Sequence, residues 1–245
     1  KGISMPELEK LRHNPTEMRS ANISRTLVRD SINTLAARIN EHAKNVDAVL
    51  MPAVVGLTGC SDVVRLKEKV DRPLYFIATL PPSVPGIRLQ MMLKKHFQKV
   101  GGTYMLGDTV TGGEFENGRL NYITTQNHAD VRFEAEDFII ATGSFFSKGL
   151  VSDINGVREP IFGLDVMSAD DRSDWYKRNL FEAQPYMNFG VATDNAFHVL
   201  QNGSVVENLY AVGSVIGGCN SMKEGSGAGV AVLSSLHVAS LILNR

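Results

Sequence analysis

Asn208-Leu-Tyr-Ala-Val-Gly-Ser214 decides the fold, together with the two segments that follow it, Val215-Ile-Gly-Gly-Cys219 and Gly225-Ser-Gly-Ala-Gly229. The short apolar run predicts a buried strand that ends in Gly-Ser. A glycine-rich loop comes next, and an Ala/Val/Leu-rich run up to Leu243 predicts a helix. This part of the chain is therefore expected to fold as a strand, a loop and a helix.

Glycines at the end of a strand let a flat ligand lie directly against the backbone, because no Cβ is in its way. The helix that follows presents free N–H groups and about half an elementary positive charge at its N-terminus. A flavin, whose pyrimidine edge gains negative charge on reduction, suits this position. An ordinary α/β strand–loop–helix has the same pattern, so this segment alone leaves both interpretations open. The candidate cofactor-binding residues here are Gly213, Ser214, Gly217, Gly218, Gly225, Ser226, Gly227 and Gly229.

A second buried strand with a similar ending is predicted at Asp137-Phe-Ile-Ile-Ala-Thr-Gly-Ser144. Before it lie two strand-like runs between Val110 and Thr125, joined by Asn117-Gly118, which favours a type I′ hairpin turn, and a further strand at Val131 to Phe133. A hairpin, a strand and a buried strand ending in Ala-Thr-Gly is the order found in two-dinucleotide-fold flavoproteins. We therefore expect the strand-end turns to meet at one edge of a parallel sheet and to bind a flavin. This adds Thr142, Gly143 and Ser144 to the candidate cofactor residues.

The first hundred residues alternate between helix and strand patterns. A helix over residues 20–44, a buried strand from Val46 to Val55, a helix from Asp62 to Val70 and a buried strand from Leu74 to Leu80 predict a parallel sheet. A proline-rich loop at residues 81–86 then leads into a predicted helix from Ile87 to Val100, which Gly101-Gly102 ends.

The expected fold class is α/β: an incomplete two-dinucleotide-fold flavoprotein with a three-layer parallel-sheet core and a small antiparallel β-meander. Two domains are expected. Residues 1–100 would form an α/β region of the substrate or cap kind. Residues 101–245 would form the C-terminal part of a flavin-binding domain with a β-hairpin insertion.

No strand followed by Gly-x-Gly-x-x-Gly occurs before residue 100, although dinucleotide folds place that phosphate-binding fingerprint in their first β-α unit. We therefore expect this chain to be a C-terminal fragment of a longer protein. Its flavin is expected to be lost or only partly retained on purification, because the missing unit would supply the phosphate contacts.

Composition excludes several classes of function. The chain has 245 residues, of which 43% are hydrophobic, which suits a globular protein. Its formal net charge of −1 gives no reason to expect nucleic-acid binding. Its two cysteines, Cys60 and Cys219, lack the paired spacing of a zinc or iron–sulfur site, so we expect no metal. Two isolated cysteines also suit a reducing compartment, so we expect a cytoplasmic location. No apolar run reaches the roughly 18–20 residues that span a bilayer, so any membrane connection would come through a partner.

Several segments are similar to the B subunits of the bacterial anaerobic glycerol-3-phosphate dehydrogenases. They are Met5-Pro-Glu-Leu8, Asn14-Pro-Thr-Glu-Met-Arg-Ser-Ala-Asn-Ile23, Leu80-Pro-Pro-Ser-Val-Pro-Gly-Ile-Arg-Leu-Gln90, Ala141-Thr-Gly-Ser-Phe-Phe-Ser147, Asn155-Gly-Val-Arg-Glu-Pro-Ile-Phe-Gly-Leu-Asp165 and the glycine-rich segment near residue 220. The similarity covers nearly the whole chain. One departure is Gly213-Ser214, where many flavoproteins have Gly-Asp, so a carboxylate that usually touches the ribityl or phosphate region is absent.

This resemblance implies a flavoprotein subunit, with FMN (or FAD) as cofactor, of a complex that oxidises sn-glycerol 3-phosphate to dihydroxyacetone phosphate. Electrons would pass towards the quinone pool in anaerobic respiration. The implied partners are an FAD-bearing catalytic subunit and an iron–sulfur, membrane-anchoring subunit. The iron–sulfur subunit would hold the complex at the cytoplasmic face of the inner membrane.

Oxidising an alcohol phosphate requires a base for the hydroxyl proton and cations for the phosphate. Arg88, at the expected start of a helix, is a candidate phosphate ligand or an ordinary solvated arginine. Arg158 is a candidate substrate ligand, or it forms a local ion pair with Glu159. His128, between two predicted strands, is the candidate general base or an exposed turn residue.

Three functions remain open from the sequence. The chain is a flavin dehydrogenase subunit that takes part in glycerol 3-phosphate oxidation, a non-catalytic electron-relay and assembly subunit, or a different flavin reductase of the fumarate-reductase type. A basic pocket facing the flavin would favour the first function, and an exposed flavin edge without such a pocket would favour the second.

Overall fold

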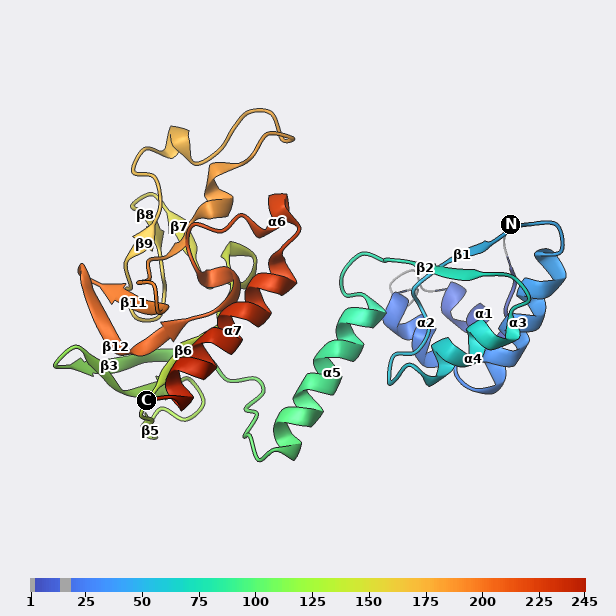
Figure 1. Cartoon of the computed structure of the whole chain (residues 1–245), viewed down its shortest axis with the longest axis horizontal. Coiled ribbons are helices and arrows are strands. Elements are labelled where there is room, and N and C mark those ends of the chain that lie inside the picture. The colour runs from blue at the N-terminus through green and yellow to red at the C-terminus, as the bar shows by residue number, and fades with distance from the viewer. Residues whose placement is uncertain (1–2, 14–18) are drawn as a thin grey trace. The chain divides into compact units, whose positions relative to one another are not determined.

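The computed structural model describes residues 3–13 and 19–245, which divide into two compact units, Lys1–Leu106 and Gly107–Arg245 (Figure 1). The fold is mixed α/β, with parallel and antiparallel strand pairs. The expected domain boundary at residue 100 lies shortly before the boundary between the two units. Residues 14–18, which belong to one of the segments quoted for the family resemblance, lie outside the described residues.

The first unit packs helices against a two-stranded parallel sheet, as its alternating pattern predicts. Its core contains Ile32, Leu35 and Ile39 from one helix, Leu66 from another, and Leu74 from a strand. The elements of this unit are α1 (Pro6–Arg12), α2 (Ser20–Thr26), α3 (Asp30–His42), β1 (Val49–Pro52), α4 (Ser61–Lys69), β2 (Leu74–Ile77) and α5 (Val84–Lys99).

The single helix expected over residues 20–44 is wrong, because the chain breaks between α2 and α3. Arg29 has a φ of 39°, which a continuing helix does not allow. The Ser31 side chain accepts a hydrogen bond from the Val28 N–H at 2.7 Å and so stabilises the break. The helical spacing of apolar residues continues across it, and therefore the pattern alone gave no sign of two helices.

Both strands of the first unit are shorter than expected and are not fully buried. β1 and β2 pair in register from Val49 with Leu74 to Pro52 with Ile77. Leu50 and Tyr75 remain 66% and 57% exposed, so one face of this sheet is open in the described chain. The following helix, α5, begins at Val84 rather than Ile87, since the Ser83 hydroxyl accepts from the Gly86 N–H and Pro85 occupies the first turn.

The second unit holds the hairpin, both glycine-ending strands and the last helix. Short strands and 3-10 turns fill residues 150–200. The elements are β3 (Val110–Glu116), β4 (Arg119–Thr125), β5 (Phe133–Glu134), β6 (Phe138–Ile140), β7 (Val151–Asp153), β8 (Gly156–Arg158), β9 (Val166–Met167), β10 (Gly190–Val191), β11 (His198–Gln201), β12 (Ser204–Ala211), α6 (Ser221–Glu224) and α7 (Gly227–Leu243).

Strands β3, β4 and β5 form a three-stranded antiparallel meander, as expected. Asn117 and Gly118 both have positive φ angles, 52° and 77°, which is the backbone of a type I′ turn. The hairpin prediction is therefore confirmed at its turn as well as at its strands.

Strand β6 pairs with β12 in parallel, and β11 pairs with the other edge of β12 (Figure 1). Leu209 and Ala211 of β12 are fully buried in the core of this unit. On its last turns, α7 contributes Val238 to a smaller cluster with Tyr210 and Val212.

A buried asparagine ties β12 to the meander. The Asn208 side chain is 2% exposed; its oxygen accepts from the Leu120 N–H at 2.8 Å, and its nitrogen donates to the carbonyls of Leu120 and Glu136. These bonds fix where β4 and β6 lie relative to β12.

Replacing Asn208 by Ala is expected to lower the free energy of unfolding by about 3 kcal/mol, because the buried Leu120 N–H loses its partner. Denaturant unfolding measures this loss. The matched control is Asn121→Ala, whose side chain makes an exposed bond to Glu116 and which should lose less than about 0.5 kcal/mol. Equal losses in the two variants would contradict this account of Asn208.

Candidate functional site

The two strand-end turns leave the sheet at the same edge. Ile140 is in register with Ala211, and the Val212 N–H donates to the Ile140 carbonyl at 3.0 Å. Residues 141–144 and 212–214 therefore begin side by side at the carboxyl ends of two parallel strands. The expectation that these turns meet at one sheet edge is confirmed.

Short distances bring the glycine-rich segments together. A Cβ on Gly143 would lie 3.6 Å from Ser214 Oγ, so the two turns approach each other closely. Gly213, with a φ of 73°, donates its N–H to Ser234 Oγ of α7 at 2.9 Å. A Cβ on Gly213 would lie 3.8 Å from the Ala231 Cβ, one turn beyond the N-terminus of that helix. We call Thr142–Ser144, Gly213–Ser214 and Gly225–Gly229 the strand-end site.

A cavity of about 120 Å³ opens at the strand-end site. It is smaller than the roughly 300–1,000 Å³ of typical ligand pockets, so it would enclose only part of a flavin. Its walls combine hydroxyl groups with aromatic and thioether side chains. They are Ser144, Phe145, Phe146, Tyr186, Met187, Phe189, Ser214, Cys219, Ser221 and Met222.

The Thr142 hydroxyl is buried and has no hydrogen-bond partner among the described residues. It lines a separate cavity of about 120 Å³ whose other walls are apolar, among them Val110, Phe138 and Ile161. An unpaired buried hydroxyl costs free energy, as it also does at Thr79 elsewhere in the described chain. A polar group of a cofactor would supply a partner for the Thr142 hydroxyl.

The N-terminus of α7 is free to bind an anion. The N–H groups of Gly227, Ala228 and Gly229 have no partner within the helix, and the Ser226 side chain does not cap them. The Ser226 hydroxyl donates instead to Glu224 Oε2 at 3.0 Å. A Cβ on Gly229 would meet no atom within 4 Å, so space for a ligand adjoins this turn.

Several of the predicted cofactor residues use their N–H groups within the protein, and two of them do so in the loop after β12. The Gly217 N–H donates to the Val191 carbonyl at 3.0 Å, and the Gly218 N–H donates to the Asn188 carbonyl at 2.8 Å. These two residues shape the loop beside the strand-end site and present no free main-chain donor to a ligand.

The sequence reasoning missed Cys219 and Ser221, which also line the cavity. Their position inside the glycine-rich loop was the available signal. Burial, together with the carboxylate of Glu224, raises the pKa of the Cys219 thiol, which is therefore protonated at neutral pH. A protonated thiol is a weak nucleophile, and we infer that Cys219 shapes the cavity rather than reacting in it.

Arg88 lies in the first unit and is held by the backbone. Its Nη1 donates to the Gly56 carbonyl at 2.6 Å, which ties α5 to the loop after β1. Arginine has five N–H donors, so this bond leaves others for a ligand.

Arg158 forms an ion pair with Asp153 across the β7–β8 hairpin, not with Glu159 as the sequence suggested. The guanidinium lowers the pKa of the Asp153 carboxyl. Glu159 is 1% exposed and accepts from the N–H groups of Ile161 and Phe162 at 3.0 and 2.7 Å. These two N–H groups of the local turn supply hydrogen bonds to the Glu159 carboxylate, and Arg158 pairs with Asp153 instead.

His128 bonds to Asp108 rather than facing the strand-end cavity. Its Nδ1 lies 2.7 Å from Asp108 Oδ2, and it is not among the residues that line the cavity. The hydroxyl of Thr125, the Asn127 N–H and the His128 ring together hold the pKa of Asp108 well below its ordinary value. This cluster fixes the loop between β4 and β5.

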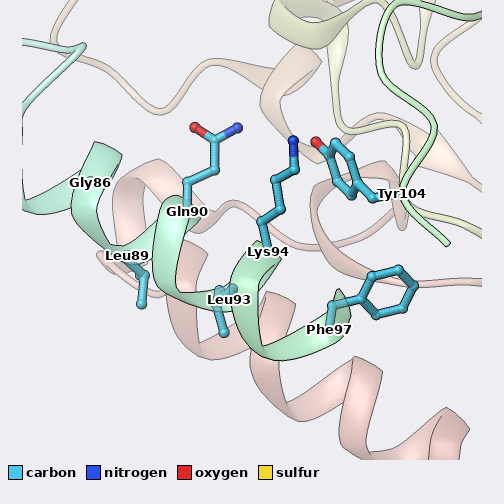
Figure 2. A pocket seen from close by; sticks show the side chains of 7 residues that line it. All are labelled: Gly86, Leu89, Gln90, Leu93, Lys94, Phe97 and Tyr104. Carbon is cyan, nitrogen blue, oxygen red and sulfur yellow. The ribbon is translucent and has the colours of Figure 1, made fainter. Parts of the chain in front are cut away.

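A further hollow of about 520 Å³ lies along α5 of the first unit and is almost wholly apolar (Figure 2). Lys94 Nζ sits 4.4 Å from the centre of the Tyr104 ring at its rim. None of the predicted site residues lines this hollow, so it is separate from the strand-end site.

Among the described residues, no group of three or more His, Cys, Asp or Glu side chains is placed to hold a metal. None of the helices in the described ranges combines the length and hydropathy needed to cross a bilayer.

Comparison with known proteins identifies the sequence family. Residues 2–230 match the family described as FAD binding domain. The B subunits of anaerobic glycerol-3-phosphate dehydrogenase from Yersinia enterocolitica and Yersinia pseudotuberculosis are 38% and 39% identical over 99% of this chain. The chain spans 57% and 58% of those two proteins, and 56% of the 38% identical B subunit from Aliivibrio fischeri. No solved structure matches this chain.

The Asp108 cluster predicts a pH dependence of stability. A carboxylate whose pKa is lowered on folding stabilises the fold above its unfolded pKa, and that contribution is lost as the pH falls through the folded value. Wild type should therefore lose stability relative to Asp108→Asn below about pH 4. Urea unfolding at several pH values measures the difference; a difference that does not change with pH contradicts the account.

Proposed function

Because the chain belongs to the family of FAD-binding domains, we propose that the strand-end site binds the flavin of an oxidoreductase. The single observation that carries the proposal is the meeting of the two glycine-ending turns with the uncapped N-terminus of α7. The buried Thr142 hydroxyl at the same edge, which has no partner among the described residues, is a further polar atom to which a cofactor group would bond. We further propose that the fold is the two-dinucleotide flavoprotein fold, because its hairpin, its parallel strands and its terminal helix follow one another in the order typical of that fold.

FAD is the proposed cofactor. The resemblance implied FMN or FAD, and the description of the matching family supports FAD. When bound, a flavin accepts two electrons and a proton from a carbon centre. The chain's own residues then bind and orient it: the first turn of α7 offers N–H groups to an anionic edge, and Thr142 offers a hydroxyl.

The proposed reaction is oxidation of sn-glycerol 3-phosphate to dihydroxyacetone phosphate, with electrons passed towards the quinone pool. It rests on the names of the relatives. The FAD-bearing catalytic subunit and the iron–sulfur subunit of such a complex would be the partners, at the cytoplasmic face of the inner membrane. Arg88 would be a phosphate ligand through the N–H groups that Gly56 leaves free.

A second function, electron relay without a substrate pocket, is favoured by the chemistry of the cavity at the strand-end site. The residues that line it include no Arg, Lys or His, so nothing in its walls would neutralise a substrate phosphate. In this alternative, the chain holds flavin and passes electrons between its partners, and substrate oxidation takes place on another chain of the complex.

Replacing Gly229 by Asp tests the anion site of α7. The carboxylate should repel the anionic part of the flavin and raise the dissociation constant for FAD about tenfold or more. It should also stabilise the helix itself, since an acid in the first turn complements the helix dipole. Flavin fluorescence titration and thermal unfolding measure the two opposite effects.

The matched control for this test is Gly229→Asn, which has the same shape without the charge and has open space around its Cβ. It should bind FAD more tightly than the Asp variant. Equal dissociation constants for the Asn and Asp variants would contradict the proposal that this helix end binds an anion.

Replacing Arg88 by Ala in the assembled complex separates the two candidate functions. A phosphate ligand remote from the reacting carbon binds substrate and transition state about equally, so KM for glycerol 3-phosphate should rise roughly tenfold or more while kcat changes less. Arg88→Lys should recover part of the loss. Steady-state kinetics measure KM and kcat, and the control is Arg65→Ala, at an exposed position of α4. An unchanged KM in the Ala variant favours the relay function.

A further inference from the structure

Gly149 lies directly against the Thr142–Gly143 turn. A Cβ on Gly149 would come within 1.9 Å of the Gly143 carbonyl oxygen and 2.8 Å of the Thr142 carbonyl carbon. The intervening loop closes through hydrogen bonds from the N–H groups of Ser147 and Gly149 to the Ser144 carbonyl, both 3.1 Å long. The backbone of residue 149 thus supports the turn from behind.

Gly190 has the same relation to the loop after β12. A Cβ on Gly190 would come within 2.3 Å of the Gly217 nitrogen and 2.5 Å of the Ile216 carbonyl carbon. The Gly217 and Gly218 N–H groups bond to Val191 and Asn188, on either side of Gly190. The segment around β10 therefore holds the 216–218 loop by backbone contacts alone.

Neither Gly149 nor Gly190 has a positive φ angle. Their backbones would accept other residues, and only the close approach of another main chain requires glycine. Gly113 of the same unit, also without a positive φ, has a similar approach inside the β3–β4 hairpin, where its Cβ would lie 2.5 Å from the Tyr122 carbonyl oxygen. Its neighbour Gly112 has none, because a Cβ there would meet no atom within 4 Å. Gly149 and Gly190 differ from Gly113 in the main chain that they approach, which is the Thr142–Gly143 turn and the 216–218 loop.

We propose that Gly149 and Gly190 are positioning residues for the flavin: through direct backbone contact, Gly149 fixes the position of the Thr142–Gly143 turn of the strand-end site, and Gly190 fixes that of the 216–218 loop beside it. This inference rests on the proposed flavin function. A flat cofactor that lies on bare backbone needs that backbone fixed to within about 0.5 Å, and a main-chain support gives way less than a flexible side chain would. An added methyl group at either position must push that turn or loop out of place.

The test compares Gly149→Ala, Gly190→Ala and the matched control Gly112→Ala with wild type, each in the full-length protein. Three measurements are made on each: far-ultraviolet circular dichroism for the fold, the FAD dissociation constant from flavin fluorescence, and the visible circular dichroism of the bound flavin. We expect Gly149→Ala and Gly190→Ala to keep the fold, bind FAD about tenfold or more weakly and change the visible spectrum. Gly112→Ala should match wild type in all three.

Unchanged FAD affinity and spectrum in both folded variants would overturn the positioning role while leaving flavin binding intact. Failure of both variants to fold would also overturn it, because the two glycines would then serve the fold as such. If one fails to fold, the other decides. Wild type that binds no FAD would instead refute the proposed function, so the two failures are distinguishable.

Discussion

The parallel pairing of β6 with β12 is the constraint on which the second unit depends. Because Ile140 and Ala211 are in register, two glycine-containing turns emerge at one sheet edge, and α7 bonds to one of them through Ser234. Asn208 fixes this pairing by bonding to the meander on one side and to the segment before β6 on the other. A slip of one residue would turn the side chains of Leu209 and Ala211 away from the core they occupy and move Gly213 away from Gly143.

Elements with strong local signals were predicted correctly from the sequence. The β3–β4 hairpin has its own turn dipeptide at Asn117-Gly118, and α7 has a long apolar run that begins after glycines. The partnership of β6 with β12 was also predictable, because two buried strands with small residues at their ends suit the ligand edge of an α/β sheet. These features need no knowledge of distant side chains.

What the sequence left undecided depends on contacts between residues far apart in the chain. Nothing near Arg88 reveals that the carbonyl of Gly56 will bond to it, and Arg158 lies next to Glu159 yet pairs with Asp153. The break at Arg29 interrupts a helical pattern that is otherwise continuous. Gly149 and Gly190 escaped notice because they lie outside the glycine-rich motifs, and only the folded chain places them against those motifs.

Hydrogen exchange measured by mass spectrometry, with and without FAD, tests most directly whether the strand-end site binds the cofactor. The account predicts slower amide exchange on FAD addition in peptides covering residues 141–150, 212–218 and 225–230, with the meander turn at residues 117–118 unchanged. Protection that is absent from those three segments, or confined to residues 1–106, would contradict it.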